Sequence, residues 1–579
     1  MKFTSSAPRL DQAASALLMT VLLTTIALIT VAGVLTYSVG TARLNYRLIQ
    51  YHRAVSAAEG DTEKVAALIS RDFLSGGEVL VTANLASYRG TTLNGSDSSY
   101  WADWEFNDAS GNTGQTFIEL GDPTNDIVAT PPYAGLHRYV STCTVVSNAR
   151  QTDAAQDVVG GVLQQLQISH IPVFQFLMYS SGDMEISCGE PFTLTGPVHS
   201  NGHLYIEPDN VMMFESGVTA VIDILPQRSP FDSRHSPSGS VVYEAGKTAP
   251  VPALTLPIGT TNTPTAVREI VQPPPPFENR NSALGRLRYY NQADLVVVVT
   301  NNGISATSGS FNSFATPIPA SELTKFISTN SSFTDWRETK TVLPIDIDIG
   351  AFTAWSATNS NERAALGGRD VSSIYVWDCR TLPPEANLLG AVRLDNGLQL
   401  PPEGLTVATA SPLYVLGHYN QTNLANLGTA NTSTTLPASL VADAVTILSP
   451  NWSDTNSMNA VASRLAAPTT VNAAILAGAV ESAGGSYGGG MENFPRFLET
   501  WGLANTLTYN GSMVKMFPSL YATNMWGRFN VYKPPTRHWA FDLNFNDPTK
   551  LPPLTPSLLV VIRGQWATVA PNQTTAPAH

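Results

Sequence analysis

The sequence has few charged residues, and this shortage excludes one class of partner. Asp, Glu, Lys and Arg make up 13% of the 579 residues, and the formal net charge is −13. No run rich in Lys or Arg occurs beyond the N-terminal region. Nucleic-acid binding needs a concentrated basic surface, so the sequence predicts no nucleic-acid partner.

Cysteine is also scarce, with Cys143, Cys188 and Cys379 as the three examples. None belongs to a CxxC pair, so a structural zinc site has no support. Two interpretations remain open: one disulfide with a spare thiol in an oxidising compartment, or three buried and inert thiols. Neither makes the fold depend on disulfides.

Motifs for common catalytic and metal-binding sites are missing. The sequence contains no EF-hand loop, HExxH, P-loop or GxSxG. His199 and Ser200 are adjacent, and neighbours on a strand face opposite ways, so a structural turn is favoured over catalysis. The pairs Asp346/Asp348 and Asp183/Glu185 alternate as in half-buried strands, although paired carboxylates can bind calcium or cleave glycosides. We expect no cofactor, with Ca²⁺ at such a pair as the alternative.

What the chain does contain is typical of a turn-rich β-protein. Gly (42) and Pro (40) are plentiful, 43% of residues are hydrophobic and ten are Trp. The length predicts two or more domains. The expected fold class is mainly β, as a β-solenoid or a sandwich, with an α+β middle region and a long N-terminal helix.

The N-terminal helix begins as an uncharged run. No charged residue occurs from Gln12 to Ala42, and about 20 apolar residues suffice to cross a bilayer. There are two alternatives. A buried core helix rarely stays apolar on every face over such a length, and the hydrophobic stretch of a cleaved signal peptide is shorter, at about 7–15 residues. We therefore predict a membrane helix, represented by Leu17, Leu18, Leu22, Ile26, Ile29 and Leu35.

The helix is expected to continue out of the membrane. Apolar residues recur at steps of four and three, which is coiled-coil spacing. The residues of this stripe include Leu44, Leu48, Tyr51, Val55, Ala58, Thr62, Val65 and Ile69. Gly76-Gly77 is the expected stop. The stripe could pack on the chain's own globular part or on neighbouring helices, and spacing leaves both open.

The helix resembles the N-terminus of type IV pilins, and the details are most similar to PilX-like minor pilins and pilus assembly proteins. The matching segments are Pro8–Leu18, where a short leader precedes an Ala-Leu run, and Arg53–Glu59. The resemblance implies processing near Ala13, Ala14 and Ser15. Ala replaces the Gly that usually precedes the cut. Met19 would occupy the fifth mature position, where major pilins carry Glu.

Segments further along resemble large pilus-assembly-like proteins with the same N-terminus. They are Ile171–Ile186, Gly196–Ile206, Gly404–Asn420 and Gly488–Trp501. The resemblance supports kinship and implies no chemistry.

Three further predictions concern local structure. Asp153–Ile168 reads as an amphipathic helix. Val407, Val445 and Ile475 are spaced as in the stacked coils of a solenoid. The aromatic alternation of Tyr100–Phe106 is typical of a half-buried strand, with a surface platform for sugars as the alternative.

These observations predict six segments. They are a leader (1–14), a transmembrane and extended helix (15–75), a mixed region (76–170), a β-rich domain with Pro-rich loops (171–391), a solenoid-like domain (392–569) and a disordered tail (570–579).

The function expected is a non-enzymatic pilin-like component of a type IV pilus or a related surface filament. We expect one inner-membrane span and a large extracytoplasmic part, although flanking positive charges do not decide the orientation. The expected partners are the membrane and other pilin-like subunits. The alternatives are a tethered β-solenoid enzyme acting on carbohydrate, and a tethered adhesin for a surface polysaccharide.

Overall fold

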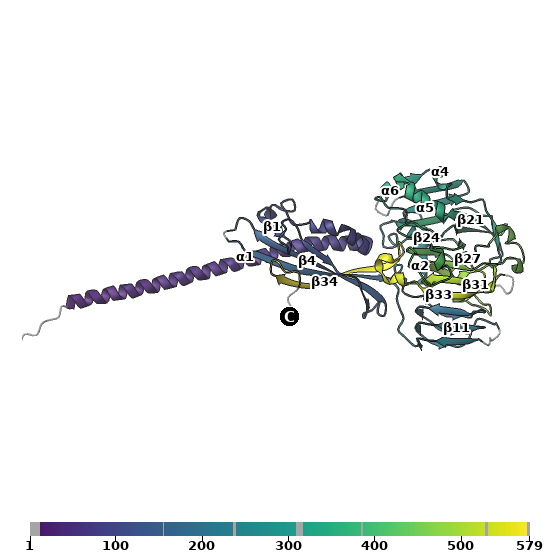
Figure 1. Ribbon diagram of the computed structural model, residues 1–579, viewed down its shortest axis with the longest axis horizontal. Helices are drawn as coiled ribbons and strands as arrows, with labels where there is room; N and C mark the ends of the chain where they lie inside the picture. The colour runs from purple at the N-terminus through teal and green to yellow at the C-terminus, as the bar shows by residue number, and fades with distance from the viewer. Residues whose placement is uncertain are drawn as a thin grey trace, which may run out of the picture. The chain divides into compact units, whose positions relative to one another are not determined.

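The computed structural model describes residues 12–154, 156–234, 239–308, 316–383, 386–526 and 531–575. The chain divides into two compact units. Unit 1 comprises Met1–Asp122, Ser141–Ile168 and Val560–His579, and unit 2 comprises Pro123–Val140 and Ser169–Leu559. The predicted combination of a long N-terminal helix with a mainly β remainder is confirmed (Figure 1).

Unit 1 begins with the helix α1 (Gln12–Arg89), which reverses direction at the predicted stop. Gly76 and Gly77 have non-helical backbone angles, and Gly77 adopts a φ of 62°. The Asp72 carboxylate accepts a hydrogen bond of 2.7 Å from the Tyr88 hydroxyl. In a straight helix residues 16 positions apart would be separated by about 24 Å. The last turns of α1 therefore fold back on the preceding ones.

The later part of α1 packs on a sheet whose strands come from distant parts of the sequence. The order is β1 (Trp104–Asn107), β4 (His137–Gln151), β5 (Val159–Pro172) and β34 (Ser557–Val569), and β2 (Phe117–Leu120) and β3 (Thr124–Ile127) also pair with β4. The division between the units falls inside β4, β5 and β34. The N-terminal helix and the C-terminal strand thus belong to the same unit.

The predicted helix at Asp153–Ile168 is wrong, because most of this segment is the strand β5. Val162 packs in a cluster with Ala54, Ala58 and Trp104, while Leu163 packs in another with Val146 and Val569. Adjacent apolar residues are therefore buried on opposite faces of one strand. Such a strand cannot be distinguished from a buried helix by periodicity.

Unit 2 consists mainly of long ladders of parallel strands, and each is named here after one member. The β29 ladder contains β15 (Lys247–Thr248), β12 (Val218–Ala220), β9 (Val198–Ser200), β6 (Met178–Ser180), β32 (Met513–Pro518), β29 (Ala474–Ala479), β26 (Ala438–Ala442), β24 (Leu405–Thr409), β22 (Ser373–Asp378) and β16 (Leu295–Thr300), and ends in the antiparallel β17 (Gly303–Ser308) and β18 (Thr316–Ile318).

The β31 ladder contains β14 (Ser240–Tyr243), β11 (Val211–Phe214), β8 (Phe192–Thr195), β33 (Lys533–Phe541), β31 (Thr500–Gly511) and β28 (Thr469–Asn472). The β23 ladder contains β21 (Lys340–Asp348), β23 (Leu388–Asp395), β25 (Leu413–Leu416), β27 (Val445–Leu448) and β30 (Pro495–Arg496), and the short β19 (Ile327–Ser328) and β20 (Phe333–Asp335) pair with β21. A shorter ladder joins β13 (Ile224–Leu225), β10 (Leu204–Ile206) and β7 (Met184–Ile186).

Helices and short turns lie between these strands. They include α2 (Pro264–Val271), α3 (Tyr289–Gln292), α4 (Ala320–Leu323), α5 (Ile349–Thr358) and α6 (Ser360–Ala365). The side chains inside the ladders form one large apolar cluster that includes Leu194, Val407, Leu440 and Tyr509.

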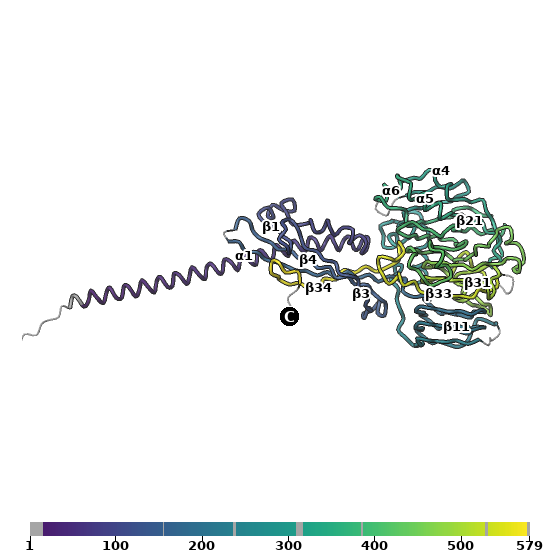
Figure 2. Tube along the Cα trace, in the orientation of Figure 1, coloured from purple at the N-terminus to yellow at the C-terminus, as the bar shows by residue number. Residues whose placement is uncertain are grey.

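The early and late strands of unit 2 are stacked on each other. β6 pairs with β32, and β8 pairs with β33, both in parallel. Figure 2 shows the blue strands around β11 beside the yellow-green strands around β33. The boundary that the sequence suggested at residue 391 therefore lies within a single unit.

The predicted stack of Val407, Val445 and Ile475 needs a correction. Val407 is aligned with Leu440, and Leu440 is aligned with Ile475, at spacings of 33 and 35 residues. Val445 lies in the β23 ladder instead, where it is aligned with Leu413. Short apolar strands of different ladders look alike in sequence, so spacing alone assigned Val445 to the wrong one.

Candidate functional site

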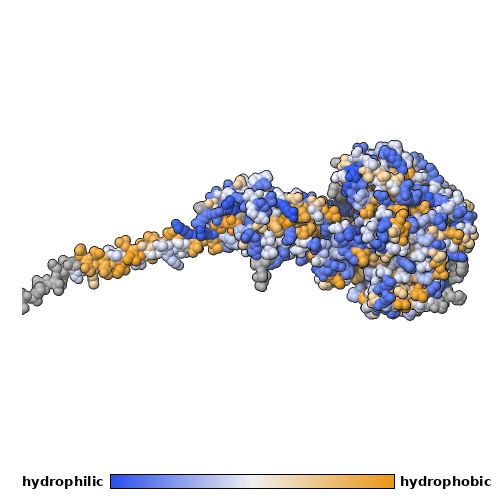
Figure 3. Space-filling model, viewed as in Figure 1, coloured by the Kyte–Doolittle hydropathy of each residue, from blue (hydrophilic) through white to orange (hydrophobic). Residues whose placement is uncertain are grey.

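The strongest functional feature is the first part of α1, which is apolar and uncovered. Every residue from Leu17 to Ile49 is exposed, including Leu17 at 70% and Ile29 at 67%. The same holds for the other predicted membrane residues, Leu18, Leu22, Ile26 and Leu35. Figure 3 shows that the surface of this part of the helix is formed mostly by its own hydrophobic side chains. By length and composition α1 can cross a membrane.

The threonine side chains between Leu17 and Tyr37 have hydrogen-bond partners within the helix. The hydroxyls of Thr24, Thr25, Thr30 and Thr36 donate to backbone carbonyls four residues earlier, at 2.7–2.8 Å. In a hydrocarbon environment every polar group needs such an internal partner. The threonine hydroxyls therefore meet the hydrogen-bonding requirement of a bilayer interior.

The exposed part of α1 is longer than a bilayer needs. At about 1.5 Å per residue, Leu17–Tyr37 spans about 31 Å, close to the thickness of a hydrocarbon core. The following residues Val39, Leu44, Leu48 and Ile49 are 50–68% exposed. A membrane over Leu17–Tyr37 would leave these four uncovered, so they form a free apolar surface that another molecule can bury.

The predicted stripe is divided between two environments. Leu44 and Leu48 are exposed and Tyr51 is half-buried, whereas the members from Val55 onward are buried within unit 1. The exposed fraction is 9% for Val55 and 0% for Ala58, Thr62, Val65 and Ile69. Of the two possibilities that the spacing left open, the later part of the stripe packs on the chain's own sheet, and the exposed earlier part remains available to other helices.

A glycine allows this close packing of helix on sheet. A Cβ atom at Gly160 in β5 would lie 2.5 Å from the backbone nitrogen of Val55 and 3.0 Å from the Cβ of Ala54. Contacts under 3.0 Å between such atoms are essentially never seen, so a larger side chain would push α1 away. Gly160 therefore sets the distance between α1 and β5.

A buried carboxylate links the same part of α1 to the rest of unit 1. Asp61 is fully buried and accepts hydrogen bonds from the Leu93 N–H at 2.5 Å, the Ser147 hydroxyl at 2.6 Å and the Thr116 hydroxyl at 3.2 Å. Burial raises its pKa from 3.8 to about 6, although these hydrogen bonds act in the opposite direction. Sequence reasoning missed Asp61, although an acidic residue beside the apolar stripe was a visible signal.

The C-terminal strand is tied to α1 by an exposed ion pair. Arg563 in β34 donates to both carboxylate oxygens of Glu63, at 2.7 and 2.6 Å. Gln164 in β5 donates to the same carboxylate at 2.8 Å. These contacts join three elements that are far apart in the sequence.

The predicted processing site lies at the start of α1. Residues 1–11 of the predicted leader lie outside the described residues, whereas Ala13, Ala14 and Ser15 belong to the helix. Residues 576–579 of the predicted tail also lie outside the described part.

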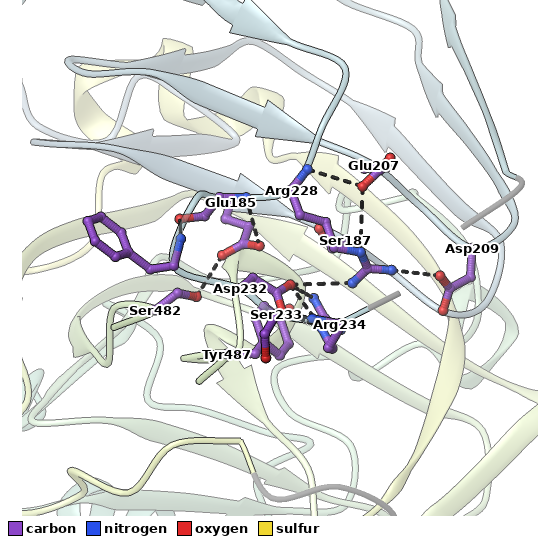
Figure 4. A network of polar contacts seen from close by, with 12 residues as sticks. Glu185, Ser187, Glu207, Asp209, Arg228, Asp232, Ser233, Arg234, Ser482 and Tyr487 are labelled. Carbon is purple, nitrogen blue, oxygen red and sulfur yellow. Dashed lines mark hydrogen bonds and ion pairs between the residues drawn. The ribbon is translucent and has the colours of Figure 1, made fainter. Parts of the chain in front are cut away.

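Unit 2 contains a cluster of charged side chains around Arg228 (Figure 4). The Arg228 guanidinium contacts Asp209 at 2.8 Å and Asp232 at 3.4 Å. Arg234 contacts Asp232 at 2.7 Å and lies 3.3 Å from the centroid of the Tyr487 ring. Each arginine thus faces a carboxylate, which is the arrangement expected of a structural network.

A small cavity lies beside this network. Its volume is about 100 Å³, and its charged lining residues are Asp183, Glu185, Glu481 and Lys515. Glu185 accepts from the Ser482 hydroxyl at 2.7 Å, and burial raises the pKa of Glu185 to about 7. A carboxyl group with such a pKa could act as a general acid. The cavity is smaller than the about 300–1,000 Å³ typical of small-molecule sites.

The other candidates have structural partners. His199 contacts Thr219 at 2.8 Å and Asn201 at 2.9 Å, whereas the Ser200 hydroxyl donates to backbone carbonyls. Asp346 pairs with Arg393 at 2.6 Å, and Asp348 caps α5. His199 and Ser200 therefore do not form a nucleophile–base pair.

The half-buried strand expected over Tyr100–Phe106 begins only at Trp104, because Ser99–Asp103 forms a short 3-10 helix. Trp104 and Phe106 are 8% and 3% exposed and pack against α1, whereas Tyr100 is 57% exposed. The thiols of Cys143, Cys188 and Cys379 are free, so no disulfide links them; Cys143 and Cys188 are buried, whereas Cys379 is only half-buried. Among the described residues, no group of three or more His, Cys, Asp or Glu side chains is arranged to hold a metal ion.

Comparisons with known proteins establish neither a family nor a fold for this chain. No protein-family model matches the chain, and a search of curated proteins gives no match. Among solved structures, the crystal structure of the competence-associated pilin ComZ from Thermus thermophilus aligns with 90% of this chain and 98% of its own. The sequence identity is 10% and the TM-score is 0.27, which is too low to establish a common fold.

Proposed function

We propose that this protein is a membrane-anchored, pilin-like component of a type IV pilus or a related surface filament. The observation that carries the proposal is the division of α1. Its first part is apolar and uncovered, whereas its later part is buried against the sheet of the same unit. A membrane would cover Leu17–Tyr37, and neighbouring subunits would cover the apolar residues that follow.

The proposal places the anchor in the inner membrane and unit 2 outside the cytoplasm. It interprets the parallel ladders of unit 2 as a β-solenoid, because successive coils bury each other's faces. It assigns the protein a structural role without catalysis, since the Glu185 cavity is small and its charged groups have protein partners. The similarity to PilX-like proteins rests on the segments Pro8–Leu18 and Arg53–Glu59.

Membrane fractionation combined with mass spectrometry of the mature N-terminus tests the anchor. We expect the protein in the membrane fraction, with Leu17–Tyr37 retained whether or not the leader is removed. Cleavage after residue 30 together with a soluble product would contradict the proposal.

Photo-crosslinking in cells tests the assembly surface. A crosslinking amino acid at Leu48 should give products with other filament subunits, identified by mass spectrometry. The same amino acid at Ile69 serves as the matched control and should react within its own chain, since Ile69 is 0% exposed. Equal intermolecular crosslinking at both positions would contradict the division of the helix.

A further inference from the structure

A cavity of about 360 Å³ opens on the outer face of the β31 ladder in unit 2. This volume falls within the range of about 300–1,000 Å³ that is typical of ligand pockets. Its polar lining residues are Thr193, Thr195, Glu215, Thr508, Asn510 and His538.

The parallel register of the ladder places these polar residues side by side. Successive residues of a strand face opposite sides, so the buried Tyr509 and Trp539 point into the core. Thr508 is aligned with His538, and His538 is aligned with Thr193. Neighbouring strands lie about 4.8 Å apart, so a polar group recurs at that interval along the ladder.

Two atoms in the lining lack the partners that their burial requires. Thr508 and Asn510 are 2% and 1% exposed, and Thr508 Oγ1 and Asn510 Oδ1 have no hydrogen-bond partner. Leaving a buried polar group unpaired costs about 1–3 kcal/mol. The Asn510 amide nitrogen donates to the Thr429 carbonyl at 3.0 Å and to Asn472 Oδ1 at 2.8 Å. These two bonds fix the amide and leave its oxygen available.

The lining excludes several kinds of ligand. The described residues around the cavity include no Lys or Arg, which a phosphate or a nucleic acid would require. A cationic ligand would have to pair with Glu215, whose carboxylate already accepts a hydrogen bond from the Thr195 hydroxyl at 2.5 Å. Apart from Ala430, Ala540 and the buried Trp539, the lining offers no apolar side chain for a lipid or an amphipathic helix.

We propose that this cavity binds a neutral saccharide chain. Hydroxyl groups of the sugar would donate to Thr508 Oγ1 and Asn510 Oδ1, and successive sugar rings would follow the ladder past His538 and Thr193. The inference goes beyond a structural role in a filament, because it assigns a ligand to unit 2. It also differs from the aromatic platform considered at Tyr100–Phe106, where Trp104 and Phe106 are buried against α1.

Histidine-selective NMR on the full-length protein tests the proposal. The protein is kept in a detergent without a sugar head group and titrated with maltohexaose, cellohexaose and laminarihexaose. The imidazole signal of His538, assigned by its loss in His538→Gln, should shift with at least one saccharide. Thr508→Val should weaken that binding about tenfold, since it removes one hydrogen bond to the ligand.

Thr406→Val provides the matched control, because the Thr406 hydroxyl has protein partners. It contacts the Ser439 hydroxyl at 2.7 Å and the Pro553 carbonyl. Thr406→Val should lower the melting temperature and leave saccharide binding unchanged. Thr508→Val should weaken binding without lowering the melting temperature, since its hydroxyl loses no protein partner.

Three results would overturn the proposal. The first is no shift of the His538 signal with any of the saccharides at millimolar concentration. The second is a shift that persists unchanged in Thr508→Val, which would place binding elsewhere. The third is a loss of stability in Thr508→Val equal to that in Thr406→Val, which would show that the Thr508 hydroxyl serves the fold.

Discussion

The two parts of α1 have similar apolar patterns and opposite environments. Leu44 and Leu48 are 68% and 54% exposed, whereas Val65 and Ile69, which continue the same spacing, are 0% exposed. The difference comes from what lies beside the helix. Gly160 and the small residues of α1 allow the sheet to approach the later part, and the earlier part extends beyond it. A helical apolar stripe therefore shows that a surface is to be buried, without showing what buries it.

Truncating one residue in each part should give the largest contrast. Ile69→Ala should lower the free energy of unfolding of unit 1 by about 3.5 kcal/mol, because it leaves a cavity in a closed core. Leu48→Ala should change it by less than about 0.5 kcal/mol. Hydrogen exchange of peptides from Gln50 to Phe73 at increasing urea measures both. Equal losses would show that Leu48 is buried in the isolated protein.

A charge in the uncovered part should abolish membrane insertion while leaving unit 1 folded. An acidic residue at the centre of a membrane helix costs about 3 kcal/mol, so Ile26→Asp should move the protein toward the soluble or aggregated fraction. Leu48→Asp is the matched control outside the span and should remain in the membrane. Extraction with carbonate followed by immunoblotting reports the distribution, and retention of Ile26→Asp would argue against a span.

The buried part should respond to pH through Asp61. Its pKa in the folded state is about 6, against 3.8 as the ordinary value, so the folded state binds this proton more tightly than the unfolded state. The contribution of Asp61 to the free energy of unfolding is therefore present at low pH and is lost as the pH rises from about 4 to about 6. Between pH 4.5 and pH 7 the loss should be about 2 kcal/mol.

Asp61→Asn should remove most of that pH dependence, because an amide does not titrate in this range. The same exchange experiment at the two pH values checks it, with Glu59→Gln on the exposed side of α1 as the control. An unchanged pH dependence in Asp61→Asn would mean that another group controls the stability of α1.

The smallest effect is expected at the edge of the buried part. Arg563→Gln removes the ion pair with Glu63, in which the two side chains are 69% and 34% exposed. Exposed pairs contribute about 0.5 kcal/mol and are weakened by salt. The β34 backbone amides should therefore exchange hydrogen slightly faster in the variant than in the wild type, and this difference should disappear at high salt.

The parts of the fold that depend on local sequence were predictable. The long helix and its reversal at Gly76-Gly77 follow from composition, spacing and the conformational freedom of glycine. The assignment of β5 was wrong because both faces of that strand are buried. Stacking of β6 on β32 could not be predicted, since it joins residues more than 300 positions apart. The saccharide cavity was missed for the same reason: Thr193, Thr508 and His538 come together only through the register of the ladder.

The most direct test of the account is the depth profile of α1 in a lipid bilayer. Spin labels are placed singly from Leu17 to Ile49, in full-length protein whose three cysteines have been replaced, and the protein is reconstituted into liposomes. Labels from Leu17 to Tyr37 should be accessible to oxygen and protected from a water-soluble nickel complex. Labels from Leu44 to Ile49 should be accessible to the nickel complex. Access of the nickel complex along the whole segment would contradict the claim that this part of α1 spans the membrane.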